Sequence, residues 1–144
     1  MIKIICVGKI KEQYLKDAIK DYQTRISKYR KLEIIEVQDS NMKAEKELIL
    51  KYIDKKDYII SLDIKGQNLT STELANKLDK TFITNSTITF IIGGSDGIDE
   101  EIKKISNYKL SFSNLTFPHQ LFRVMLLEQI YRSFKILNNE TYHK

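Results

Sequence analysis

Short runs of apolar and β-branched residues alternate along the chain with segments whose apolar residues recur every three or four positions. The runs predict five strands, at residues 2–8, 32–38, 57–64, 87–93 and 108–113. The segments between them predict helices. Strict alternation of this kind implies crossover connections. It therefore predicts an α/β fold with a mostly parallel sheet covered by helices on both faces.

The predicted helices differ in how well their faces are defined. Single apolar faces run from Leu15 to Tyr29, from Ala44 through Tyr52 to Ile53, and from Leu74 to Phe82, and a short one lies near Ile102. The third of these begins with the capping box Thr-Ser-Thr-Glu at residues 70–73. The last helix, residues 119–137, is apolar on more than one face. We expect one side to meet the sheet, while the other is suited to a second subunit.

Composition sets limits on the class of protein. The chain has 144 residues, of which 42% are hydrophobic and 30% charged, as expected for one domain over residues 1–144. No apolar run approaches the roughly 20 residues needed to span a bilayer, and the N-terminus reads as the first strand of a cytoplasmic protein. The single cysteine, Cys6, lies in that strand and is expected to be buried. No Cys/His cluster suggests a metal. The net charge of +5 is compatible with an anionic partner such as RNA, and equally with a basic surface that binds no such partner.

The ends of three predicted strands carry the candidate chemistry, because ligands of parallel sheets bind beyond the carboxyl ends of the strands. The third strand ends in Ser-Leu-Asp, with Leu62, and the fourth in the glycine-rich residues 93–97. That loop lacks the G-x-G-x-x-G pattern, and its Asp96 would repel a pyrophosphate. It is either a tight strand-to-helix turn or a site for a neutral or cationic adenosine-bearing ligand.

The fifth strand leads into a loop without charge, residues 111–118. Its backbone groups could hold an adenine edge, or it is an ordinary loop capped by its hydroxyl and amide side chains. Pro118 is expected in the first turn of the next helix, where it fixes the point at which the loop stops. His119 is either structural or catalytic.

The C-terminal end offers a second set of candidates. Arg132 lies among apolar residues, four positions after Glu128, and is either one half of an ion pair or a functional group. The final residues, Tyr142, His143 and Lys144, are either a frayed terminus or groups that bind or deprotonate a substrate.

Four segments together resemble one known family. They are IKIICVGKIKEQY (2–14), IIGGSDG (91–97), LSFSNLTFPHQLFRVMLLEQIYRSFKI (110–136) and the terminal YHK (142–144). The chain is thereby similar to the ribosomal RNA large subunit methyltransferase H family, of the SPOUT class. The resemblance implies a homodimer with a C-terminal trefoil knot. It also implies S-adenosyl-L-methionine as methyl donor and N3 of a pseudouridine in 23S rRNA of the assembled ribosome as acceptor.

The resemblance also assigns residues. The methyl donor is expected to contact eight of them: Leu62, Gly93, Phe112, Ser113, Asn114, Leu115, Thr116 and Phe117. Of the candidate catalytic residues, His143, Tyr142 and Arg132 are ranked in that order as a general base, and in the reverse order as stabilisers of the substrate anion. The family often has glycine and proline before the terminal tyrosine, whereas this chain has Asn-Asn-Glu-Thr at 138–141.

The sequence is also compatible with two other classes of function: a non-catalytic ribosome-binding module of the same fold, and a flavodoxin-like nucleotide enzyme. For an RNA-binding protein, six basic residues are candidates for contacting phosphates: Lys9, Lys11, Arg25, Lys28, Arg30 and Arg123.

Overall fold

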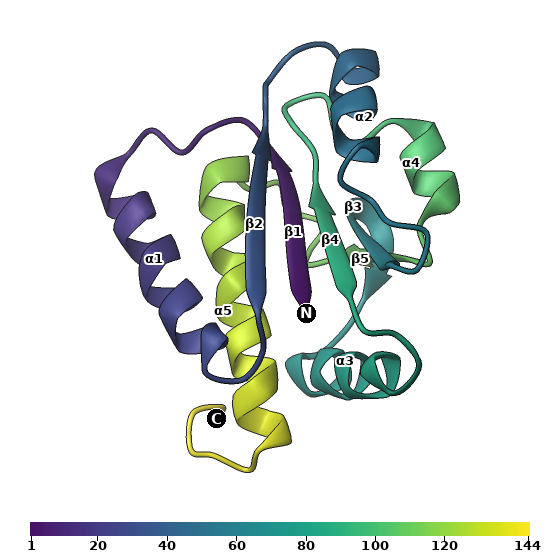
Figure 1. Cartoon of the computed structure of the whole chain (residues 1–144). Helices are drawn as coiled ribbons and strands as arrows, with labels where there is room; N and C mark the ends of the chain where they lie inside the picture. Colours follow the sequence, from purple (N-terminus) through teal and green to yellow (C-terminus); the bar gives the residue numbers. More distant parts are fainter.

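The computed structural model describes all residues, 1–144, as five strands and five helices (Figure 1). The strands are β1 (Ile2–Val7), β2 (Leu32–Val37), β3 (Tyr58–Asn68), β4 (Ile88–Ile92) and β5 (Tyr108–Ser111). The helices are α1 (Gln13–Ser27), α2 (Met42–Leu50), α3 (Ser71–Thr84), α4 (Glu100–Ile105) and α5 (His119–Leu137). All ten elements lie where the apolar pattern predicts them.

The strands form one sheet in the order β2-β1-β4-β3-β5, and every pairing is parallel. Strand β4 is the central strand, and β1 lies inside the sheet between β2 and β4. The predicted α/β class is therefore confirmed, and the sheet is wholly parallel.

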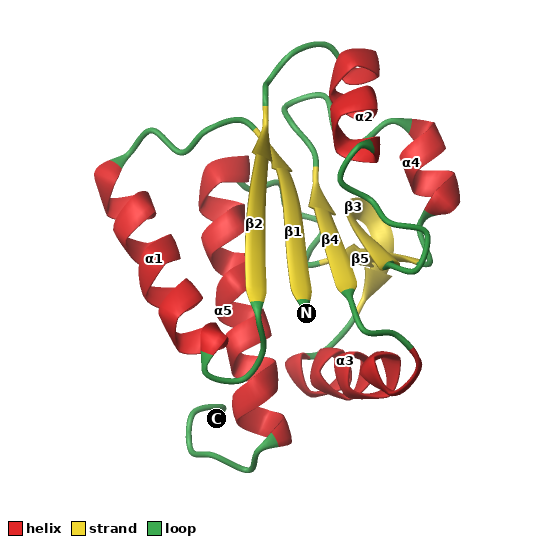
Figure 2. Ribbon diagram, viewed as in Figure 1, coloured by secondary structure: helices red, strands yellow, loops and turns green.

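Alternate residues of the strands face two separate cores. Ile2, Ile4 and Cys6 of β1 belong to a cluster of 19 buried residues, together with residues of α1, α3 and α5. Ile5 and Val7 belong to a cluster of 8, together with residues of α2 and α4. Figure 2 shows the helices distributed over both sides of the yellow sheet, as predicted. No helix is long and apolar enough to cross a membrane.

Helix α5 runs the length of the sheet. It follows the edge strand β5 but returns to pack between α1 and α3. Its 19 residues rise about 1.5 Å each, so the two ends are about 28 Å apart. Figure 1 shows its first turn near the carboxyl ends of the strands and its last turn, followed by the C-terminus, at the opposite edge. The trefoil knot stays a prediction.

Three details differ from the predictions. Strand β3 runs on to Asn68, with a register shift against β5 between Leu62 and Gln67. Helix α2 ends at Leu50, so Tyr52 lies outside it and is 45% exposed, where the spacing placed it on the buried face. Pro118 caps α5 from outside the helix, instead of occupying its first turn. The capping box at Thr70 and Glu73 is confirmed.

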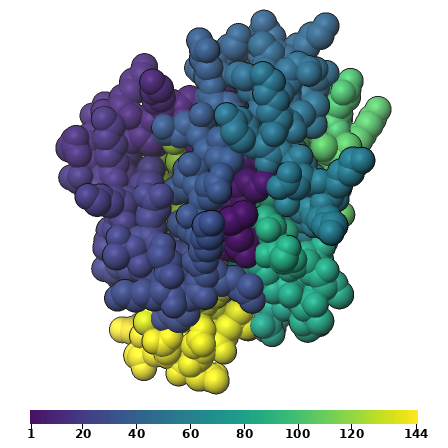
Figure 3. Space-filling view, in the orientation of Figure 1, coloured from purple at the N-terminus to yellow at the C-terminus, as the bar shows by residue number.

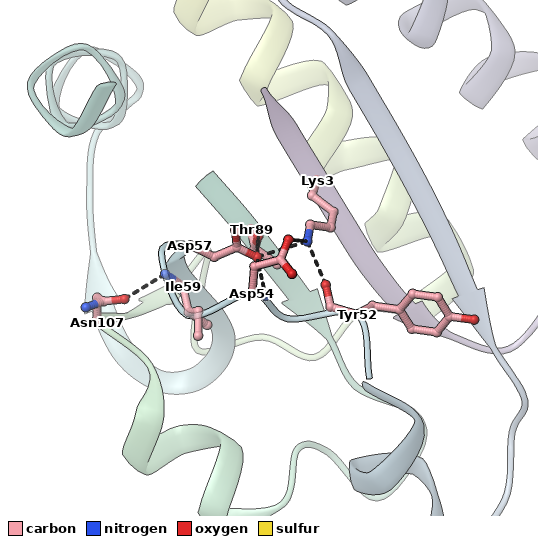
Figure 4. Close-up of polar contacts among 7 residues, drawn as sticks. All are labelled: Lys3, Tyr52, Asp54, Asp57, Ile59, Thr89 and Asn107. Carbon is pink, nitrogen blue, oxygen red and sulfur yellow. Dashed lines mark hydrogen bonds and ion pairs between the residues drawn. The ribbon is translucent and has the colours of Figure 1, made fainter. Parts of the chain in front are cut away.

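One ion pair is buried between β1 and the start of β3 (Figure 4). The Lys3 ammonium lies 2.9 Å from Oδ2 of Asp57, and both side chains are about 5% exposed or less. The ammonium also donates to the Tyr52 carbonyl at 2.6 Å, while the Thr89 hydroxyl donates to the same Asp57 oxygen at 2.9 Å. These partners satisfy the charges that burial takes out of water.

Candidate active site

A cavity of about 450 Å³ opens at the carboxyl ends of β3, β4 and β5. Its walls come from the end of β3, from the glycine-rich loop after β4, and from the loop that joins β5 to α5. Seven of the eight predicted donor contacts line it: Leu62, Gly93, Phe112, Ser113, Leu115, Thr116 and Phe117. The eighth, Asn114, is exposed and is absent from the lining.

The glycine-rich wall is a tight turn. The amide of Gly97 donates to the carbonyl of Gly94 at 3.0 Å, and Gly97 has a φ of +86°. A Cβ on Gly93 would lie 2.5 Å from the Gly97 carbonyl oxygen, so a side chain has no room there. The turn thus brings backbone to the cavity where a side chain would otherwise stand.

Aromatic contacts fix the loop between β5 and α5. Phe122, in the first turns of α5, lies edge-on to Phe112 at 4.8 Å and stacks on Phe117 at 6.0 Å. Within the loop, the Ser113 hydroxyl accepts from the amide of Leu115 at 3.0 Å. These contacts hold the loop in a defined shape, as a preformed binding site requires.

An ion pair in the wall of the cavity, between Asp63 and Lys103, was not predicted as part of the site. Asp63 is about 10% exposed; one of its oxygens accepts from the Lys65 amide at 3.0 Å and the other lies 3.5 Å from the Lys103 ammonium. Asp63 immediately follows the predicted contact Leu62, and this adjacency is the signal that could have found it. Lys103 lies in the short helix α4, where its pattern is that of an ordinary surface residue.

The cavity suits S-adenosylmethionine better than a dinucleotide. Its size is within the range of small-molecule sites, and nine of its 21 lining residues are hydrophobic, which suits an adenine. The lining carries two carboxylates, Asp63 and Asp96, and two ammonium groups, Lys65 and Lys103, so it has no excess of positive charge for a pyrophosphate. No group of three or more His, Cys, Asp or Glu side chains is placed to hold a metal ion.

The three predicted catalytic residues meet at the other end of α5. Nη1 of Arg132 lies 3.0 Å from Nδ1 of His143, and its guanidinium carbon lies 4.8 Å from the centre of the Tyr142 ring. Glu128 accepts from Nε of the same guanidinium at 2.7 Å. The ring of Tyr142 packs edge-on against Tyr131 at 4.9 Å. We call residues 138–144 the tail; its atoms, yellow in Figure 3, form one end of the molecule.

Side chains of α5 and of the turn after α1 hold the tail in place. The carboxylate of Glu140 accepts from the Tyr29 hydroxyl at 2.7 Å and from the Lys135 ammonium at 3.0 Å. Asn139 adopts a left-handed φ of +53°, a conformation that commonly ends a helix. The tail therefore folds back onto the protein, and this tyrosine-rich surface was missed. The available signal was three tyrosines: Tyr22 in α1, Tyr29 in the turn after it and Tyr131 in the facing helix α5.

Two groups of the tail titrate away from their ordinary range. Burial, followed by the charge of Glu128, raises the pKa of the Tyr142 phenol to about 12. The Tyr29 hydroxyl and the Lys135 ammonium lower the pKa of the Glu140 carboxyl. At neutral pH, Tyr142 is therefore a neutral phenol and Glu140 a carboxylate.

Arg123 has a structural place instead of the predicted phosphate contact. It is 1% exposed, pairs with Glu36 at 2.7 Å and donates to the Gly8 carbonyl at 3.1 Å. Its guanidinium therefore ties α5 to the ends of β1 and β2 and cannot reach RNA. The other five candidates, Lys9, Lys11, Arg25, Lys28 and Arg30, are exposed.

Comparisons with known proteins agree with this arrangement. A family model described as "Predicted SPOUT methyltransferase" matches residues 1–143. Ribosomal RNA large subunit methyltransferase H of Clostridium botulinum strain Kyoto is 54% identical, over 99% of both chains. The protein of the same name from strain Loch Maree is 51% identical, again over 99% of both.

Two solved structures share the fold at 15% identity. A "probable methylase family protein" of Haemophilus influenzae has a TM-score of 0.62, covering 99% of this chain and 70% of that one. The tRNA (m1G37) methyltransferase of Aquifex aeolicus has a TM-score of 0.54, covering 91% and 69%. Because the family model and the curated relatives match practically the whole chain, this protein belongs to the ribosomal RNA large subunit methyltransferase H family of SPOUT methyltransferases.

Proposed function

We propose that this protein transfers a methyl group from S-adenosylmethionine to N3 of a pseudouridine in 23S rRNA of the assembled ribosome. Membership of the family supports the reaction class, and the names of the relatives support ribosomal RNA as acceptor. The observation that carries the proposal is the pair of preformed sites: a cavity suited to the donor and a tail that gathers Arg132, Tyr142 and His143.

The two sites must come from two copies of the chain. The cavity includes His119 at the start of α5, whereas His143 contacts Arg132, which lies 13 residues further along that helix and so about 20 Å away. In-line methyl transfer needs donor and acceptor in contact. We infer a homodimer in which the tail of one subunit reaches the cavity of its partner. Leu115 and Leu121, which are 71% and 41% exposed near the cavity, provide apolar surface for such a contact.

Within such a composite site, each part of the chain has a separate task. The loop of residues 112–117 and the turn at Gly93 bind and orient the donor, whose sulfonium supplies the methyl group. The tail holds the pyrimidine and stabilises charge on it. The exposed basic residues in α1 and in the segments on either side of it contact rRNA phosphates; they are Lys9, Lys11, Arg25, Lys28 and Arg30. The contribution of such positioning can reach several kcal/mol.

The test is transfer of labelled methyl from S-adenosylmethionine to ribosomes that lack the modification, with naked 23S rRNA in parallel. We expect label on assembled ribosomes and its loss when the target pseudouridine is replaced by uridine. Donor binding without label on either RNA would contradict the assigned substrate. Failure to bind the donor would instead support a non-catalytic ribosome-binding module.

A further inference from the structure

We propose that the tail contains no general base: it binds the deprotonated pyrimidine through hydrogen-bond donors, and His143 donates through Nε2–H to one of its carbonyl oxygens. This inference rests on the proposed function. It reverses the role for which the sequence ranks His143 first, that of proton acceptor.

The contact between His143 and Arg132 carries the inference. A guanidinium has only N–H donors and keeps its proton at every physiological pH. The imidazole nitrogen that lies 3.0 Å from Nη1 of Arg132, Nδ1, must therefore accept. In a neutral imidazole the other nitrogen, Nε2, then carries the proton. In this arrangement neither nitrogen is free to take a proton from the substrate.

Glu128 holds in place the guanidinium of Arg132, which determines which nitrogen of His143 carries the proton. Its two carboxylate oxygens lie 2.7 and 3.3 Å from Nε of Arg132, which leaves Nη1 directed at the histidine. Both partners of this pair are partly buried, with exposed fractions of 24% for Arg132 and 19% for Glu128. Glu128 is thus a positioning residue, and its own lone pairs are engaged by the guanidinium.

The phenol of Tyr142 and the side chains that α1 places beside it are hydrogen-bond donors as well. Tyr142 keeps its phenolic proton, because burial raises its pKa to about 12. On α1, Tyr22 and Arg25 pack beside Tyr131, which itself contacts Tyr142. The carboxylates nearby are all engaged: Glu128 by Arg132, Asp21 by Arg25 at 3.2 Å, and Glu140 by the Tyr29 hydroxyl and the Lys135 ammonium. A pyrimidine held here meets a neutral phenol, an imidazole N–H and a guanidinium.

The chemistry balances without a protein base. The N3 proton of the pseudouridine leaves to solvent water or hydroxide, and the negative charge spreads over N3 and both carbonyl oxygens. The N3 lone pair then forms a bond to the donor methyl carbon. The carbon–sulfur bond breaks with its electron pair going to sulfur, so that anion and sulfonium become two neutral products. Donors at the carbonyl oxygens stabilise the anion on which this step depends.

Replacement of His143 by glutamine separates the two roles, because the glutamine amide offers an N–H near the position of Nε2 but cannot accept a proton. Under single turnover with saturating donor, we expect His143→Gln to stay within about 10-fold of wild type and His143→Ala to lose about 100-fold or more. If glutamine is as inactive as alanine, the donor role is overturned.

The pH dependence of the methyl-transfer rate gives a second, independent test of the role of His143. Without a protein base, the single-turnover rate rises about tenfold per pH unit towards the pKa of N3 itself, and the profile of His143→Gln has the same shape as that of wild type. A wild-type profile that flattens near neutral pH, with the slope restored in His143→Gln, would identify His143 as the base and overturn the proposal.

A measurement on the free protein keeps this inference separate from the proposed function. The chain has only two histidines, so ¹⁵N NMR of the imidazoles gives two ring systems, and the one lost in His143→Gln is His143. We expect its Nδ1 to be unprotonated and its Nε2 protonated. The opposite tautomer contradicts the donor role even if methyl transfer is observed. Absence of methyl transfer with the expected tautomer contradicts the proposed function alone.

Discussion

At the scale of single residues, Gly93 is the position where the fold leaves least freedom. A methyl group there would meet the Gly97 carbonyl at 2.5 Å and the Ile98 side chain at 2.9 Å. We predict that Gly93→Ala lowers the free energy of unfolding by about 1–3 kcal/mol and moves the turn, which weakens donor binding at least tenfold. Urea unfolding and calorimetric titration with S-adenosylmethionine measure the two effects.

Gly8→Ala is the matched control for that variant. Gly8 has a φ of +91° with nothing within 4 Å of its Cβ position, so alanine strains the backbone by about 1–2 kcal/mol without a clash. Gly8 is absent from the cavity lining, and its variant should lose stability while keeping donor affinity. Equal loss of affinity in both variants would show that the turn at Gly93 has no specific role.

The titration of Tyr142 is a second property of one residue. Its pKa is raised from the ordinary 10.0 to about 12 in the folded state, so folding favours the protonated phenol. The resulting stabilisation is present in full below pH 10 and is lost as the pH rises through 12. We predict that the ultraviolet difference titration between wild type and Tyr142→Phe shows phenolate formation near pH 12. Ionisation near pH 10 would mean that the tail is detached.

At the scale of elements, the buried pair between Lys3 of β1 and Asp57 before β3 ties two strands that are not neighbours in the sheet. Without Asp57, the buried Lys3 ammonium keeps only the exposed Asp54 carboxylate at 3.6 Å, so its charge is poorly compensated. We predict that Asp57→Ala lowers the free energy of unfolding by about 3–5 kcal/mol, measured by urea denaturation at fixed protein concentration. The double variant Lys3→Met/Asp57→Ala should recover most of that loss. No recovery would mean that the loss arises from packing instead of charge.

Local patterns were sufficient to predict the ten elements, because apolar spacing and capping residues such as Thr70 act within a few positions. They could not predict the register shift of β3 against β5, because register depends on the partner strand. It also depends on Gly66, where a Cβ would lie 2.6 Å from the Lys109 carbonyl oxygen. Arg123 was misjudged for the same reason: its partners Glu36 and Gly8 are remote in sequence. The rule that ligands bind beyond the carboxyl ends of parallel strands located the walls of the cavity, whereas its individual donor contacts were assigned by resemblance. Their separation from the tail follows only from the direction of α5.

At the scale of the whole molecule, exposed basic residues should bring the protein to rRNA. We predict that Lys9→Gln/Lys11→Gln lowers the slope of log affinity for ribosomes against log salt by about 1.5. The matched control is Lys55→Gln/Lys56→Gln, which removes the same charge from the turn before β3. If both pairs change the slope equally, net charge alone accounts for binding. Filter binding of ribosomes at several salt concentrations measures this slope.

The central claim is that each active site combines the cavity of one subunit with the tail of the other. It is tested most directly with mixed dimers of Thr116→Trp, which fills the cavity, and His143→Ala, which disables the tail. Each variant alone should be nearly inactive. Only a composite site joins the intact cavity of one with the intact tail of the other, so a 1:1 mixture should regain about a quarter of wild-type methyl transfer to ribosomes. A mixture no more active than the separate variants would contradict the account.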